Sequence, residues 1–180
     1  MSKKWYNQER ENMRVRIEKI RKRDLPAFYS LFKKALLEDF KEYSPEVAEF
    51  QWKRHRKSNL LRWVKQGEEY LFAAKDKKGK VVGILASQRI VGGVSHCDWL
   101  IVSKEHRGQG IGKRLLSFWE NWVKRNKGHM LTVSCSRRNL GYYKKLGFKK
   151  YGYLQQGYFG ENDYELFKRI GEFNKKSLKV

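Results

Sequence analysis

The chain has 180 residues, enough for one domain with a substantial core and too few for two domains of ordinary size. Lys and Arg outnumber Asp and Glu by 41 to 19, which gives a net charge of +22. A heat-adapted surface would raise both signs together, so this excess points instead to an acidic partner, nucleic acid included. Because the first residues are polar and no apolar run reaches the length of a membrane span, we expect a cytoplasmic protein without membrane contact, as a monomer or homodimer.

The first third of the chain predicts one strand and two helical regions. A polar leader over residues 1–13 precedes a short strand at residues 15–20. Asp24 is expected to cap a helix whose apolar residues recur at helical spacing over 28–36, so one side of this helix faces a sheet. A Ser-Pro pair opens a second helical region, predicted to run over residues 44–67.

Three antiparallel strands are predicted next. Apolar, β-rich runs cover residues 70–75, 80–90 and 95–102, and they are separated by turn signals at 76–79 and at Gly92-Gly93. The two cysteines of the chain fall in predicted strands without metal or redox spacing, so we interpret them as free core thiols.

The second half adds, in order, a long helix, a strand, a short helix and a final hairpin (residues 111–123, 129–135, 138–146, 148–154 and 164–168). The order βααβββαβαββ predicts an α/β fold with a mixed sheet of about seven strands and about four helices. We place this single domain at residues 14–170, followed by a basic tail at 171–180.

A glycine-rich loop joins the last of the three strands to the long helix. Residues 100–116 read LIVSKEHRGQGIGKRLL, with glycines at 108, 110 and 112. Glycines let the backbone approach a ligand, and the free amides of the first helical turn then bind an anion such as phosphate. The spacing fits neither the dinucleotide fingerprint nor the P-loop, so another phosphate ligand is expected.

Two motifs carry a resemblance to a known family. Arg107-x-x-Gly110-x-Gly112 resembles the signature with which GNAT-family N-acetyltransferases hold the pyrophosphate of acetyl-CoA. Asn139-x-x-Tyr142-Tyr143-x-x-x-Gly147-Phe148 resembles a second family segment, in which an asparagine contacts the cofactor and a tyrosine faces its sulfur. With the order of elements, the resemblance covers roughly residues 14–170 and implies a single-domain GNAT fold.

The resemblance implies acetyl-CoA as the co-substrate and needs no metal. By residue it assigns the cofactor to Ile101, Val102, Arg107, Gly108, Gln109, Gly110, Ile111, Gly112, Lys113, Asn139 and Tyr143. It also implies that the Val102 backbone amide stabilises the thioester oxygen and that Tyr143, not Tyr142, protonates the departing thiolate. No metal-binding histidine spacing and no nucleophile motif are present, which favours direct transfer of the acetyl group to a primary amine of a small molecule, peptide or protein.

The base that deprotonates the amine is expected on the strand before the glycine loop. Side chains alternate along a strand, so His96, Asp98, Leu100 and Val102 are predicted to share a face, and His96 and Asp98 are the candidate bases. The alternative left open is that His96 is a hydrogen-bonded sheet residue and that Asp98 satisfies a backbone amide.

The acceptor is not identified by the sequence, and a second class of function stays open. Aromatic residues near the final hairpin are candidates for an acceptor cleft (Tyr151, Tyr153, Tyr158 and Phe159). The positive charge is dense at residues 53–57, a run that a solvated helix face also explains. A basic GNAT-like module that binds RNA, ribosomes or another polyanion with little catalysis is the alternative function.

Overall fold

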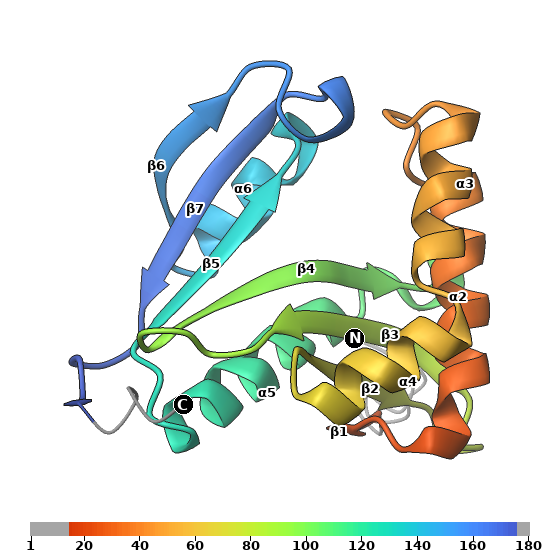
Figure 1. Cartoon of the computed structure of the whole chain (residues 1–180), viewed down its shortest axis with the longest axis horizontal. Coiled ribbons are helices and arrows are strands. Elements are labelled where there is room, and N and C mark those ends of the chain that lie inside the picture. Colours follow the sequence, from red (N-terminus) through yellow and green to blue (C-terminus); the bar gives the residue numbers. More distant parts are fainter. Residues whose placement is uncertain (1–14, 176–180) are drawn as a thin grey trace, which may run out of the picture.

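The structure, a computed structural model, describes residues 15–175; the predicted leader and the last five residues of the predicted tail lie outside this range. Its centre is one seven-stranded sheet in the order β1-β2-β3-β4-β5-β7-β6 (Figure 1). The strands are β1 (Arg16–Lys19), β2 (Glu69–Lys75), β3 (Val81–Gln88), β4 (Val94–Val102), β5 (Met130–Cys135), β6 (Lys149–Leu154) and β7 (Asp163–Arg169). All neighbouring pairs are antiparallel except β4 and β5, which makes the sheet mixed, as predicted.

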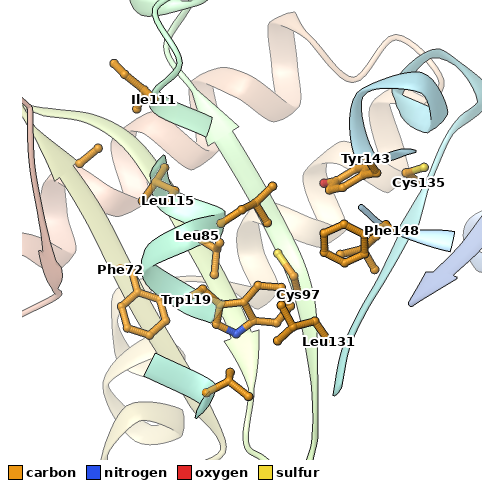
Figure 2. Close-up of a cluster of buried hydrophobic side chains, with 14 of the residues drawn as sticks. Phe72, Leu85, Cys97, Ile111, Leu115, Trp119, Leu131, Cys135, Tyr143 and Phe148 are labelled. Carbon is orange, nitrogen blue, oxygen red and sulfur yellow. The ribbon is translucent and has the colours of Figure 1, made fainter. Parts of the chain in front are cut away.

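Helices cover both faces of this sheet. They are α2 (Leu25–Glu38), α3 (Pro45–Arg54), α4 (Lys57–Gln66), α5 (Ile111–Arg125) and α6 (Arg137–Lys145). The first three pack on one face over a core that includes Phe28, Phe32 and Leu60. The other face carries α5 and α6, and Figure 2 shows Leu115 and Trp119 of α5 among the strands there.

The parallel pair β4 and β5 separates along its length. Pairing runs only from Val94 and Met130 to Cys97 and Val133. Beyond these residues the two strands diverge, as Figure 1 shows, so the second half of β4 has β3 as its neighbour on one side and a split in the sheet on the other. The glycine loop follows at the end of β4, so the split leads directly to the start of α5.

The second helical region is two helices, not one, so the predicted number of about four becomes five. His55 ends α3, and Arg56 takes an extended conformation with ψ at 154° before α4 begins. Side chains stabilise the break: the His55 ring bonds the Gln51 carbonyl at 2.8 Å, and Asn59 donates to the Arg54 carbonyl at 2.7 Å. No glycine or proline marks this break in the sequence.

Asp24 precedes α2 but does not cap it through its side chain, contrary to the prediction. Its carboxylate accepts a hydrogen bond from Lys75 Nζ at 2.7 Å instead, and Lys75 also bonds Glu18 at 2.8 Å. These charges hold the first helix against β1 and β2. The prediction of two free cysteines is confirmed, because Cys97 and Cys135 are both buried thiols.

Candidate active site

The glycine loop borders the candidate site at the start of α5. Gly110 has φ of 74°, a conformation that favours glycine, and directly precedes α5, whose first amides point out of the helix. Arg107 donates from Nε to the Val102 carbonyl at 3.0 Å and pairs with the Asp39 carboxylate at the end of α2. The predicted glycine loop before a helix is therefore present, its binding of an anion stays a prediction, and one of its cations is already paired with an acid.

At Gly112 the space, not φ, disfavours a side chain. A Cβ at this position would lie 2.6 Å from the hydroxyl of Tyr142 and 3.8 Å from Cγ2 of Val102. The start of α5, the end of β4 and α6 thus meet at Gly112. A larger residue here would push Tyr142 aside or narrow the end of the split.

The backbone of Val102 faces the split. Its carbonyl accepts from Arg107, whereas the next amide, that of Ser103, donates to Val82 in β3 at 3.0 Å. Because the N–H and C=O of one strand residue point to the same side, the Val102 N–H also faces away from β3. This amide is where a donor to a thioester oxygen is predicted.

Tyr143 lies on the α5 side of the split. Its ring packs edge-on against Phe148, with ring centroids 5.6 Å apart, and only 8% of the residue is exposed. Figure 2 shows the ring beside Cys135 and Phe148 with its hydroxyl turned toward β4. Burial raises the pKa of Tyr143 well above its ordinary value, so the hydroxyl keeps its proton at neutral pH.

Tyr142 is more exposed than Tyr143 and has a different environment. Its exposed fraction is 38%, and its hydroxyl lies against the first turn of α5, as the space at Gly112 shows. Burial of its hydroxyl end raises its pKa to about 12. The two adjacent tyrosines therefore present their hydroxyls to different parts of the site.

Ser136, directly before α6, is a residue that the sequence analysis did not single out. Asn139, the predicted cofactor contact, lies in the first turn of α6 and is exposed. Ser136 is the N-cap of this helix, yet its Oγ is buried and has no hydrogen-bond partner among the described residues. A buried hydroxyl without a partner is costly, so the environment of Ser136 is incompletely satisfied, while the cofactor contact of Asn139 stays a prediction.

A β-bulge in β4 overturns the prediction that four alternate residues share one face. Ser87 of β3 pairs with Cys97 and Ala86 pairs with Trp99, so Asp98 is an extra residue. His96 and Asp98 line a cavity together, as expected, but Leu100 and Val102 pack in the core on the α5 side. The bulge turns the second half of the strand over relative to the first.

This cavity, of about 900 Å³, lies between α3, α4, β4 and the final hairpin. Asp98 accepts a hydrogen bond from the Gln88 side chain at 2.8 Å, and Nδ1 of His96 lies 2.9 Å from Oγ1 of Thr132. Asp98 thus bonds a side-chain amide rather than a backbone amide, and its burial raises its pKa. His96 is hydrogen-bonded within the sheet, the arrangement left open as the alternative, and also lines the cavity.

Glu69 at the start of β2 is a third candidate base, and it lines the same cavity. Its Oε2 is buried and has no partner among the described residues. Burial, together with the nearby charge of Asp98, raises the pKa of Glu69 to about 8. The sequence placed Glu69 at the edge of a strand, and the strand order that brings it toward Asp98 was not visible there.

A sequence profile of the Acetyltransferase (GNAT) family matches residues 25–148, which is more than half of the chain. The chain belongs to the GNAT acetyltransferase family. No curated protein sequence matches it.

Solved GNAT structures share the fold at low sequence identity. The PaiA N-acetyltransferase of Thermoplasma acidophilum in complex with coenzyme A has a TM-score of 0.74 at 20% identity, covering 87% of this chain and 99% of its own. The ribosomal-protein-S5-alanine acetyltransferase of Vibrio fischeri has a TM-score of 0.70 at 19% identity, covering 89% and 95%. A spermidine N-acetyltransferase chimera of Vibrio cholerae SpeG and hSSAT has a TM-score of 0.69 at 16% identity, covering 92% and 99%.

The remaining residues that the GNAT resemblance assigned are distributed around the start of α5. Gly108, also at positive φ, and Gln109 lie in the loop, and Gln109 bonds the Glu105 carbonyl at 3.3 Å. Ile111 is buried in the core and Lys113 is exposed. The Ile101 side chain packs with the α2 core, on the face opposite to Val102. Within residues 15–175, no cluster of three potential metal ligands is present, and no helix is long and apolar enough to cross a bilayer.

Proposed function

We propose that this GNAT protein transfers the acetyl group of acetyl-CoA directly to a primary amine held in the 900 Å³ cavity. The observation that carries the proposal is the split between β4 and β5. The glycine loop lies at the end of this split. Tyr143 lies on the face of the sheet that carries α5, and the cavity with Asp98 lies on the opposite face. The glycine loop thus suits the phosphates of acetyl-CoA, Tyr143 suits its thioester, and the cavity with Asp98 suits the amine.

Three groups of the chain divide the chemistry. Asp98 or His96 takes one proton from the ammonium group of the acceptor, so that its nitrogen carries a lone pair to form the new C–N bond. The Val102 N–H donates to the thioester oxygen as that oxygen gains charge. As the tetrahedral adduct collapses to the amide, the nitrogen releases its second proton to solvent. Tyr143 gives its hydroxyl proton to the CoA sulfur when the C–S bond breaks, and it regains a proton from solvent.

Several features of the structure fit acetyl-CoA in this split. The amides at the start of α5 suit its pyrophosphate, and the Val102 N–H faces the split beside them. By their names, two structural neighbours act on spermidine and on an alanine of a ribosomal protein. Both of those acceptors are amines, which supports an amine as the acceptor of this chain.

The test combines acetyl-CoA binding with release of CoA thiol across a panel of amines. Gly110→Asp should abolish acetyl-CoA binding, because it places a carboxylate against the pyrophosphate as well as straining the backbone. Gly79→Asp is the matched control, because an added Cβ has no neighbour within 4 Å at either glycine and φ is 78° at Gly79 and 74° at Gly110. Unchanged calorimetric affinity in a folded Gly110→Asp protein would contradict the assignment.

A further inference from the structure

The acceptor cavity has the opposite charge to the rest of the molecule. Five acidic side chains and two arginines line it (Glu68, Glu69, Asp98, Asp163, Glu165, Arg54 and Arg89), and Glu69, with a pKa of about 8, is mostly protonated at neutral pH. The whole chain carries a net charge of +22. Charges on the outer surface are screened beyond about 8 to 10 Å at physiological salt, so a bound molecule is governed by the carboxylates that it touches.

Three of these carboxylates form a row across the sheet. Glu69 is on β2, Asp98 on β4 and Glu165 on β7, and the sheet order places β3 and β5 between them. Neighbouring paired strands lie about 4.8 Å apart, so Glu69 and Asp98 are attached to the backbone roughly 10 Å apart, whereas Asp98 and Glu165 stand on opposite sides of the split. Asp98, the central one, stands at the split where the acetyl group is transferred. The row therefore extends to both sides of the reacting amine.

The β7 end of the row is built to bind a cation. Ser134 donates to Oε2 of Glu165 at 2.9 Å, which fixes the carboxylate, while Oε1 is buried without a partner among the described residues. Asp163 lies two residues earlier on the same face of β7 and also lines the cavity. A buried carboxylate oxygen without a donor is unfavourable, and an ammonium group would supply that donor.

Aromatic rings complete the β7 end of the cavity. Phe159, from the turn η3 (Tyr158–Gly160), contacts Tyr43 and Phe50 with ring centroids 6.2 Å and 5.9 Å apart. These contacts join the final hairpin to α3 and its preceding loop at the edge of the cavity. Aromatic faces pack well against methylene groups and attract ammonium groups, and a small flexible amine fits beneath such a bridge more readily than a folded protein.

We propose that the acceptor is a linear aliphatic polyamine. Its reacting terminal amine lies beside Asp98, and a distal ammonium group is bound by Glu165 and Asp163. This inference rests on the proposed acetyl transfer and adds to it the class of acceptor and the residues that select it. Glu165 and Asp163 act here as specificity-determining residues.

The test compares three amines that differ in the number of cationic nitrogens: butylamine, 1,4-diaminobutane and spermidine. With acetyl-CoA and the full-length protein, we expect kcat/KM to rise at least about tenfold from butylamine to spermidine, because a distal ammonium gains a charge-assisted hydrogen bond. Glu165→Gln keeps the shape and the bond from Ser134 but removes the charge, and it should lower kcat/KM for spermidine much more than for butylamine. Asp163→Asn should act in the same direction, and thermal melts show that each variant is folded.

Glu172→Gln is the control, because Glu172 lies beyond β7 with 89% of its side chain exposed and should leave the preference for spermidine intact. Equal kcat/KM values for butylamine and spermidine would overturn the polyamine proposal, and so would a better rate with basic peptides. Acetylation of any of those amines would leave the transferase proposal standing. If the protein binds acetyl-CoA but acetylates no amine, the proposed function itself is wrong.

Discussion

A buried histidine beside the acceptor cavity makes the stability of the fold depend on pH in a way that can be measured. His55 is 5% exposed, its Nδ1 donates to the Gln51 carbonyl at 2.8 Å, and its Nε2 accepts from the Trp99 indole at 3.1 Å. Protonation of Nε2 would set two N–H groups against each other in a dry environment. Burial accordingly lowers the pKa of His55 to about 4, from 6.5.

The magnitude follows from the two pKa values. Between pH 6.5 and about 4 the unfolded chain binds a proton at residue 55 that the folded chain does not bind. The free energy of unfolding therefore falls as pH decreases, by about 1.4 kcal/mol per pH unit, or roughly 3 kcal/mol over the whole window. Glu69 has a raised pKa of about 8, so its protonation makes the free energy of unfolding rise as pH decreases over part of this range. In the wild type alone this rise hides part of the fall caused by His55.

The assay is denaturant unfolding of the wild type and of His55→Gln at several pH values. As the pH falls from 6.5 to about 4, the wild type should lose roughly 3 kcal/mol of unfolding free energy relative to the variant. Lys57→Gln, an exposed substitution two residues away, controls for loss of a positive charge. A wild-type minus His55→Gln difference that stays constant with pH would refute the reasoning, because it would mean that His55 is charged or solvated in the folded state.

Three further predictions concern catalysis and charge. Tyr143→Phe should lower turnover by on the order of 10² with acetyl-CoA binding retained, whereas Tyr142→Phe should have little effect; single-turnover kinetics that implicate only Tyr142 would show the wrong tyrosine was assigned. Activity should rise with pH as the base loses its proton, and Asp98→Asn or His96→Gln should flatten that rise in a pH–rate profile. Retention of the full profile by both would exclude them and leave Glu69. If the surface charge recruits nucleic acid, labelled RNA should bind with a steep salt dependence, and a variant with three cations of the 53–57 run changed (Lys53, Arg56 and Lys57 to Gln) should show a shallower slope; absence of binding at low salt would contradict this.

The sequence predicted those parts of the fold that depend on local patterns. Alternating apolar residues located the strands, and glycine spacing located the loop before α5. The distinction between the two tyrosines came from the resemblance to the GNAT segment, in which the spacing to Gly147 selects Tyr143. Tyr143, four residues before Gly147, is the buried one that faces the split. Local spacing is sufficient in these cases because each feature is confined to one or two turns of chain.

The remaining features depend on partners distant in sequence. Asp24 looked like a helix cap because Lys75, its actual partner, lies in a strand 51 residues away. The break after His55 is stabilised by side chains that have no strong preference for turns. Glu69 could be named from the sequence only as a fallback base, because its place within two strands of Asp98 depends on the sheet order. No residue in isolation carries this information.

The bulge at Asp98 gives β4 two different sets of neighbours while its burial pattern stays regular. Buried and partly exposed residues alternate without interruption from Val94 to Val102. Yet Cys97 belongs to the core under α5, and Ile101 belongs to the core under α2. A scan of single substitutions along β4 would therefore show unbroken alternation, and only compensating second substitutions, sought on α5 for Cys97 and on α2 for Ile101, would reveal that the strand changes sides.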